Sequence, residues 1–246
     1  MGVYHITYSP GLRQVCLFFN EKCNFSCKGC VRKSTPQDSH LNEDGKNSKT
    51  NKVLITKEVI SYLASVSFDK VIFLGSEPTV DSDFLSLAEG IKKRFSSYNT
   101  LITNGYRHIQ ERILDEVCVS IKAVSSDIFR TFTGRNNPEQ VMNNFKKYAE
   151  FSWIKLRAES IFIPGYIDCR EVEKISSFIA EIDERIPYRI DAYIPSRRYL
   201  PVKKNCFRRP TEKEMFSAKL SAEKHLRNVS ILYKGIPLKN KVERIY

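Results

Sequence analysis

Short apolar runs alternate with longer stretches of helical periodicity from about residue 52 onward. The run at 71–74 is bounded by Lys70 and Gly75, which predicts a strand buried on both faces. Apolar residues then recur at positions 84, 85, 87, 88, 91 and 95, and this spacing predicts one apolar stripe on a helix. The pattern predicts strand–helix units of the βαβ type.

The same reasoning extends over most of the chain. Further strands are predicted at 14–19, 99–103, 117–121, 153–163 and 188–194, and helices at 106–116, from 137, at 170–182 and at 211–227. Thr211 and Glu214 form a capping box for the last helix, and Asn137 with Pro138 begins another.

About six repeats are too few for a closed eight-stranded barrel. We therefore expect an α/β fold, an open partial (β/α)6 barrel with parallel strands over about 14–194. A C-terminal helical extension should cover about 195–246, and the whole of 1–246 should form a single domain. Ligands of such sheets bind at the carboxyl ends of the strands.

Composition adds a bias toward anionic partners. The chain has 40 Lys and Arg against 28 Asp and Glu, a net charge of +12, and a field of this sign attracts anions. No run approaches the roughly 20 apolar residues that span a bilayer, and the N-terminus lacks a signal-peptide pattern, so we expect a cytoplasmic protein without membrane contact. Two segments stand out, a polar one at 33–52 and a basic one at 197–209.

Three of the seven cysteines follow the first predicted strand of the barrel. Cys23, Cys27 and Cys30 have the spacing C-x3-C-x2-C, and thiolates so placed can hold three corners of an iron–sulfur cubane. One iron would then stay open to an external ligand, as a catalytic metal requires. The alternatives are a structural zinc site, which would need a fourth ligand such as His40, and cysteines with no shared role.

This cysteine motif after the first barrel strand resembles the signature of the radical S-adenosylmethionine (SAM) superfamily. The resemblance covers about 14–194 and implies a [4Fe–4S] cluster whose open iron is chelated by SAM. It further implies reductive cleavage of SAM to a 5′-deoxyadenosyl radical, which abstracts hydrogen from a substrate. That chemistry implies anaerobic conditions and an electron donor of the flavodoxin or ferredoxin type. The aromatic residue that often precedes the third cysteine is replaced here by Gly29.

Two further motifs follow predicted strands. The segment Gly75, Ser76, Glu77 and Pro78 resembles the "GGEP" segment that binds the SAM amino group, with Ser76 in place of the second glycine. Carboxylate and carbonyl oxygens can accept hydrogen bonds from an ammonium group. Asn104 belongs to a Thr-Asn-Gly segment that resembles the family's "TNG", which places its amide near the SAM ribose. An ordinary turn is the alternative for each motif.

The next two strands carry the remaining candidates. Ser120 and Lys122 resemble a "D-L-K" segment of enzymes that activate glycyl radical enzymes, which implies that Lys122 contacts the SAM carboxylate; a solvated lysine is the alternative. Arg157 and Glu159 are two residues apart on a strand, so both should face the barrel interior, where they are candidates for contact with SAM. Their strand continues into a segment that resembles the branch's "V-P-G-x-x-D" pattern. The histidine common near the sixth strand is absent.

Two main substrate classes are open for an enzyme of this kind. The first is a glycyl residue of a partner enzyme, and it rests on the strand-end motifs and the short chain. The second is a nucleic acid or a nucleotide-like molecule, and it rests on the positive charge and the segment 197–209. A solvated basic loop would explain that segment equally, and a binding protein without catalysis is a further alternative.

Overall fold

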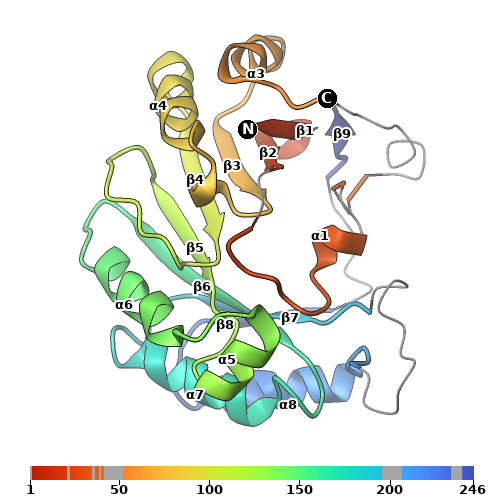
Figure 1. The fold of residues 1–246 in the computed structure, drawn as a ribbon, viewed down its shortest axis with the longest axis vertical. Helices are drawn as coiled ribbons and strands as arrows, with labels where there is room; N and C mark the ends of the chain where they lie inside the picture. The colour runs from red at the N-terminus through yellow and green to blue at the C-terminus, as the bar shows by residue number, and fades with distance from the viewer. Residues whose placement is uncertain are drawn as a thin grey trace.

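The computed structural model describes residues 2–20, 23–34, 37–38, 40–41, 52–195, 207–233 and 240–246. Within these residues the strands form one nine-stranded sheet in the order β8-β7-β6-β5-β4-β3-β2-β1-β9. They are β1 (Val3–Ser9), β2 (Gln14–Phe19), β3 (Lys70–Gly75), β4 (Tyr98–Thr103), β5 (Glu116–Ser120), β6 (Lys155–Phe162), β7 (Tyr188–Ala192), β8 (Val229–Leu232) and β9 (Glu243–Arg244). The sheet curves without closing, with β8 and β9 at its two edges (Figure 1).

The strands from β2 to β7 are parallel and follow one another in sequence order, which confirms the open partial barrel. Helices lie on the outer side of the curved sheet (Figure 1). They are α3 (Thr56–Leu63), α4 (Phe84–Phe95), α5 (Ser126–Thr133), α6 (Pro138–Ala149), α7 (Cys169–Ala180) and α8 (Glu212–Glu223). None of the described helices has the length and apolar character needed to cross a membrane.

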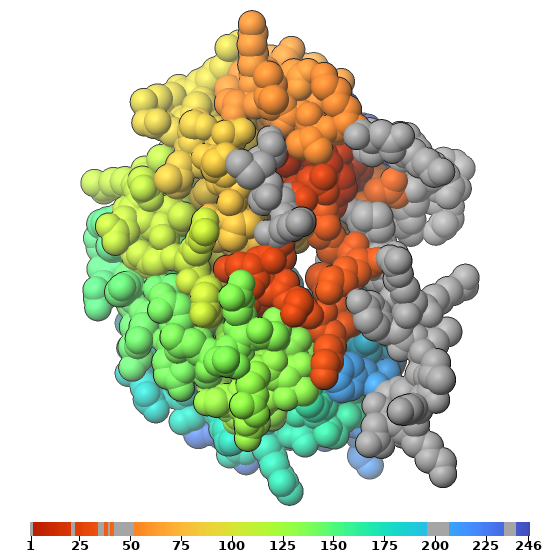
Figure 2. Space-filling view, in the orientation of Figure 1, coloured from red at the N-terminus to blue at the C-terminus, as the bar shows by residue number. Residues whose placement is uncertain are grey.

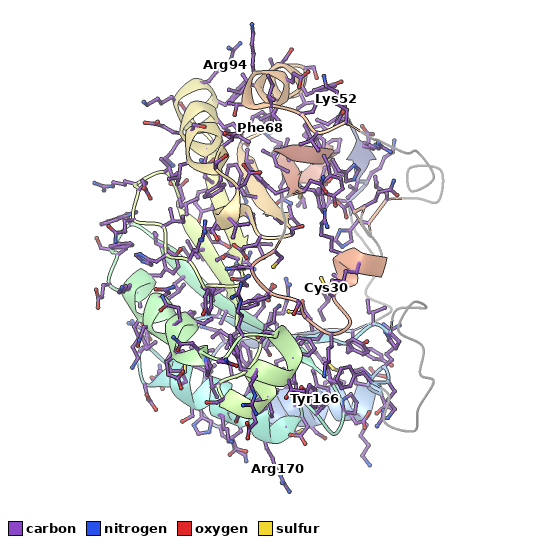
Figure 3. The ribbon with its side chains drawn as sticks, viewed as in Figure 1. Cys30, Lys52, Phe68, Arg94, Tyr166 and Arg170 are labelled. Carbon is purple, nitrogen blue, oxygen red and sulfur yellow. The ribbon has the colours of Figure 1, made fainter. Side chains whose placement is uncertain are left out.

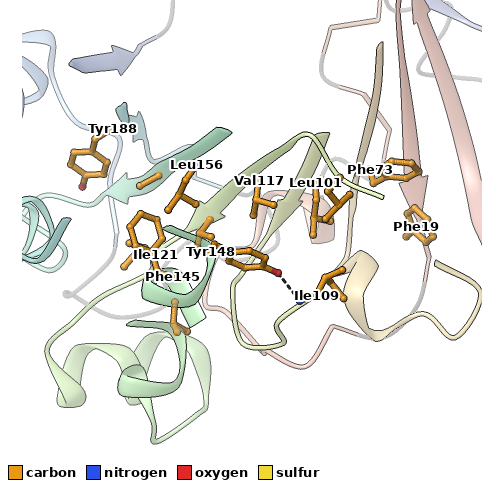
Figure 4. Close-up of a cluster of buried hydrophobic side chains, with 14 of the residues drawn as sticks. Phe19, Phe73, Leu101, Ile109, Val117, Ile121, Phe145, Tyr148, Leu156 and Tyr188 are labelled. Carbon is orange, nitrogen blue, oxygen red and sulfur yellow. Dashed lines mark hydrogen bonds between the residues drawn. The ribbon is translucent and has the colours of Figure 1, made fainter. Parts of the chain in front are cut away.

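The core lies between the sheet and this outer layer. Leu17, Phe73, Leu101 and Val117 are fully buried and belong to one hydrophobic cluster, and Figure 4 shows the side chains of Phe73, Leu101 and Val117 on neighbouring strands. The alternate residues of the same strands face the inside of the barrel, because side chains alternate across a strand. Full burial of each such apolar side chain contributes about 1.5–3 kcal/mol.

The helix predicted at 106–116 is wrong, since that segment contains turns and bends without a helix. Two of its backbone groups bond to side chains that are distant in the sequence. The Tyr148 hydroxyl accepts from the Ile109 N–H at 2.9 Å (Figure 4), and the Asn99 amide donates to the Ile113 carbonyl at 3.0 Å. Such bonds compete with helix formation.

Both ends of the chain contribute strands that the periodicity did not predict. β1 pairs antiparallel with β2 and with β9, so the C-terminal residues lie beside the first strand. β8 extends the parallel sheet beyond β7. The C-terminal extension therefore supplies the expected helix α8, whose Thr211–Glu214 capping box is confirmed, and also two strands of the sheet. The segments 33–52 and 197–209 lie mostly outside the described residues.

Candidate functional site

The three clustered cysteines lie on one loop between β2 and the short helix α1 (Val31–Ser34). This loop reaches the surface at the centre of the face shown in Figure 2, where it appears in red-orange. Cys23, Cys27 and Cys30 are all half-buried, and Figure 3 shows Cys30 at the inner side of the curved sheet. The loop therefore stands at the carboxyl ends of the parallel strands, as the sequence predicts.

The end of α5 fixes the path of this loop. The backbone N–H groups of Ser26 and Lys28 donate to the Thr133 and Phe132 carbonyls at 2.8 and 2.9 Å. The last carbonyls of a helix have no partner within it, so these bonds satisfy both the helix and the loop. The cysteine loop is held by backbone contacts that do not depend on a bound group.

A tyrosine packs against the loop from the end of β7. Gly29 has φ +73°, and a Cβ there would lie 2.4 Å from the Tyr193 hydroxyl oxygen and 2.7 Å from its Cε2. Tyr193 is buried with Phe132, Ile163 and Ile167, and Cys27 packs on that cluster. The chain has no aromatic residue at position 29, but the ring of Tyr193, from the end of β7, occupies the space beside Gly29.

The thiols differ in their surroundings. Burial raises the pKa of Cys23, while the Phe25 N–H at 3.3 Å and the Asn104 side-chain amide at 3.6 Å from its Sγ favour the thiolate. Burial raises the pKa of Cys27 to about 11, and the Lys122 ammonium acts in the opposite direction. Both donors and the nearby cation suit sulfur atoms that carry negative charge when they bind metal.

The carboxylate of Glu77 joins the ends of β3 and β4. Its oxygens accept from the Thr79 hydroxyl at 2.6 Å, the Thr103 hydroxyl at 2.7 Å and the Asn104 N–H at 2.7 Å, with a longer bond from the Thr79 N–H. The residue is only 1% exposed, and burial raises its pKa. Glu77 therefore holds two strand-end loops together, and through Asn104 it is linked to Cys23.

Gly75 lies against the backbone of Phe19 at the end of β2. Its φ is +119°, and a Cβ would lie 2.5 Å from the Phe19 nitrogen and 2.7 Å from the Phe19 oxygen. The Ser76 N–H donates to that same oxygen at 3.1 Å. Pro78 then begins the single turn η2 (Pro78–Val80). Glycine is required at the first position of this motif by backbone contact.

The other predicted residues lie along β5 and β6. The Lys122 ammonium donates to the Ser120 hydroxyl, just beyond the end of β5. Arg157 and Glu159 both face the barrel interior, as their spacing predicts, but each pairs with another residue. Arg157 forms an ion pair with Glu116, and Glu159 accepts from Arg189 at 2.7 Å.

The roles of several contributors were not predicted. Thr103 belongs to the Thr-Asn-Gly segment, but its bond to Glu77 was not expected, and no role was assigned to Tyr193 or Arg189. The α5 carbonyls could not be found at all, because backbone groups leave no residue-type pattern. Period-two alternation from Arg157 and Glu159 onto the next strand would have identified Arg189 as an inward cation.

The residues of the loop fit an iron–sulfur cluster. Three thiols on one short loop match the donor set, and each cubane ligand binds a separate iron at its own corner. The described residues contain no group of three His, Cys, Asp or Glu that meets at a single metal ion. The three thiols of a cubane cluster bind three different iron atoms, so they need not meet at a single ion.

Comparison with known proteins agrees with this geometry. The family profile described as the Radical SAM superfamily matches residues 17–179. A candidate glycyl-radical enzyme activating enzyme of Methanocaldococcus jannaschii is 29% identical over 213 residues, which cover 85% of this chain and 76% of the relative. The GTP 3′,8-cyclase of Haemophilus ducreyi is 25% identical over 170 residues, covering 66% of this chain and 48% of the cyclase. The chain thus spans about half of that second relative.

A solved structure shares the fold. A domain of the pyruvate-formate lyase-activating enzyme from Bacteroides vulgatus superposes with a TM-score of 0.52 at 18% identity. The match covers 66% of this chain and 98% of that domain. At this level of identity the likeness concerns the arrangement of the strands and helices.

Proposed function

Because the chain belongs to the radical SAM superfamily, we propose that Cys23, Cys27 and Cys30 hold the [4Fe–4S] cluster that this family uses with SAM. The observation that carries the proposal is the cysteine loop itself. It is fixed by the Phe132 and Thr133 carbonyls at the carboxyl ends of the parallel strands. Three cysteine ligands leave one iron of the cubane for SAM.

The neighbouring strand ends would receive SAM. We assign its amino group to Gly75–Pro78, its ribose to Asn104 and its carboxylate to Lys122 beside Ser120. Glu77 is saturated with internal donors, so its contribution is to position the backbone around it. The side-chain nitrogen of Lys122 can donate hydrogen bonds to a carboxylate.

When bound, the cluster and SAM supply reductive cleavage to methionine and a 5′-deoxyadenosyl radical, with one electron from a flavodoxin- or ferredoxin-type donor. The residues of this chain orient SAM at the open iron and keep water away from it. Burial of Cys27 against Tyr193 and Phe132 contributes the apolar side of that shelter. The substrate then loses one hydrogen atom to the radical, and 5′-deoxyadenosine is released.

Two substrate classes have support. The relative from Methanocaldococcus jannaschii, which this chain covers over most of its length, supports a glycyl residue of a partner enzyme. The GTP 3′,8-cyclase relatives support a nucleotide-like molecule.

The test is the release of 5′-deoxyadenosine by anaerobically reconstituted protein. With SAM and a strong reductant, we expect slow release without substrate, and a severalfold rise when the correct substrate is added. Added GTP tests the nucleotide class by chromatography of the nucleoside product. A glycyl radical enzyme tests the other class, through a carbon-centred radical signal in the paramagnetic resonance spectrum. Protein that holds its cluster but releases no 5′-deoxyadenosine would contradict the proposal.

A further inference from the structure

A cavity of about 520 Å³ lies inside the open barrel. It begins at Val31 and Arg32, which directly follow Cys30, and at Gly75 of the strand-end motif. From there it extends along the inward faces of the strands on both sides of the barrel. This volume falls within the range of about 300–1,000 Å³ that small-molecule sites occupy.

The two sides of the cavity differ in chemistry. Inward side chains of β2, β3 and β4 form an apolar wall that includes Phe18, Leu74 and Ile102. The opposite wall carries Arg157 of β6 and Arg189 of β7, and the lining also includes the Asp38 carboxylate, which is already paired with Thr7 at 2.7 Å and with His40 at 2.9 Å. An apolar wall that faces a few fixed polar groups is the usual composition of a site for a small organic molecule.

Carboxylates behind the arginines hold them in place. Arg157 pairs with Glu116, and Arg189 pairs with Glu159 at 2.7 Å and with Asp191 at 2.6 Å. The arginine side chains are 26% and 35% exposed, while Glu116 and Glu159 are 12% and 14% exposed. The guanidinium groups therefore stand in front of their partners and face the cavity.

These guanidinium groups keep donors for a ligand. Among the described residues, the two Nη atoms of Arg157 and Nη1 of Arg189 donate to no side chain or carbonyl. Arg32 lies at the entrance of the cavity, two residues after Cys30. Its Nε is buried and has no hydrogen-bond partner among the described residues. A guanidinium fork matches the geometry of carboxylate and phosphate groups.

We infer that this cavity binds a small substrate with an apolar body and one anionic group, a phosphate or a carboxylate, which Arg157 and Arg189 hold. The word "substrate" rests on the proposed radical SAM function, whereas the binding itself needs neither electron nor turnover. The inference favours a small molecule over a glycyl loop, because the backbone around a glycine carries no charge to match the arginines. It also moves Arg157 from contact with SAM to contact with the substrate, and it gives Glu159 the role of holding Arg189 in place.

Binding of three matched probes to the reconstituted full chain tests the inference. Phenyl phosphate, phenylacetate and the neutral benzyl alcohol share an aromatic body and are measured by anaerobic calorimetry. We expect at least one anion to bind about 10-fold or more tightly than benzyl alcohol, and the better anion identifies the phosphate or carboxylate class. Arg157→Gln and Arg189→Gln should each lower the affinity for that anion about 10- to 100-fold, which is the effect of losing one charge-assisted hydrogen bond.

The controls separate a lost ligand contact from a damaged fold. Arg112→Gln removes an arginine that lies over Trp153, away from the cavity lining, and should leave the affinity unchanged. Arg157→Gln removes the cationic partner of the Glu116 carboxylate, so the double variant Glu116→Gln/Arg157→Gln is measured too. It should bind the anion as weakly as Arg157→Gln does.

Three results with protein that binds the probes would overturn the inference. They are equal binding of the neutral probe, wild-type affinity in both arginine variants, or displacement of the anion by SAM, which would make this the SAM site. Protein that cleaves SAM without binding the anions would refute this inference alone. Protein that binds the anions without a cluster would refute the proposed function alone.

Discussion

Replacing Cys23, Cys27 and Cys30 together by alanine is expected to reduce the cluster iron of the reconstituted protein from about four atoms per chain to none. The three thiols sit on one loop, and every described thiol outside this loop belongs to another element. The loop path is fixed by backbone bonds to α5, so the variant should keep its fold while losing its ligands. Iron and sulfide analysis, together with the brown absorbance of the cluster, provides the measurement.

Cys16→Ala and Cys118→Ala are the matched controls. Both thiols point into the barrel from β2 and β5, and burial raises the pKa of Cys16 to about 12, which disfavours the thiolate that binds iron. These variants should keep the full iron content. A triple variant that still holds iron would show that the ligands lie elsewhere.

Gly75→Ala is expected to lower the free energy of unfolding by about 2–5 kcal/mol, the sum of a strained backbone angle and an overpacked contact. The new Cβ would meet the backbone of Phe19 at 2.5 Å, and backbone atoms of a paired strand cannot move aside cheaply. Such a loss is a large part of the stability of an ordinary domain. Urea denaturation followed by circular dichroism under anaerobic conditions measures it.

Gly90→Ala provides a control of opposite sign. Gly90 lies within α4, where an added Cβ would meet Ile60 at an ordinary 3.4 Å. Alanine is the better helix former by about 0.5–1 kcal/mol, so this variant should be slightly more stable than the wild type. Equal stability of the two variants would mean that the contact between Gly75 and Phe19 has been misjudged.

The sequence predicts the parallel barrel well because its strands are short runs of β-type residues whose outward positions are apolar and buried. It misses β1, β8 and β9 because these strands lie at or near the sheet edges, where fewer apolar residues are buried. It assigns a helix to 106–116 because apolar residues recur there at helical spacing. The conformation of that segment is set by hydrogen bonds from the distant residues Asn99 and Tyr148, and local periodicity carries no information about such bonds.

For the site, the sequence predicts what is encoded in short motifs. The cysteine spacing and the residues at Gly75 and Asn104 follow their strands and lie together in the structure. What the sequence cannot provide is the pairing between strands. The spacing of Arg157 and Glu159 predicts that both face inward, but only the register of the sheet gives them Glu116 and Arg189 as partners. The same register brings Tyr193 onto Gly29.

The central claim is a cluster with one iron open to SAM, and the paramagnetic resonance spectrum of the reduced cluster tests it most directly. Recorded on the reconstituted chain before and after SAM is added, the signal should change in position and shape, because a new ligand alters the electronic environment of the iron it binds. The Lys122→Ala variant should need more SAM for the same change. A signal of a reduced [4Fe–4S] cluster that stays identical at saturating SAM would contradict the claim.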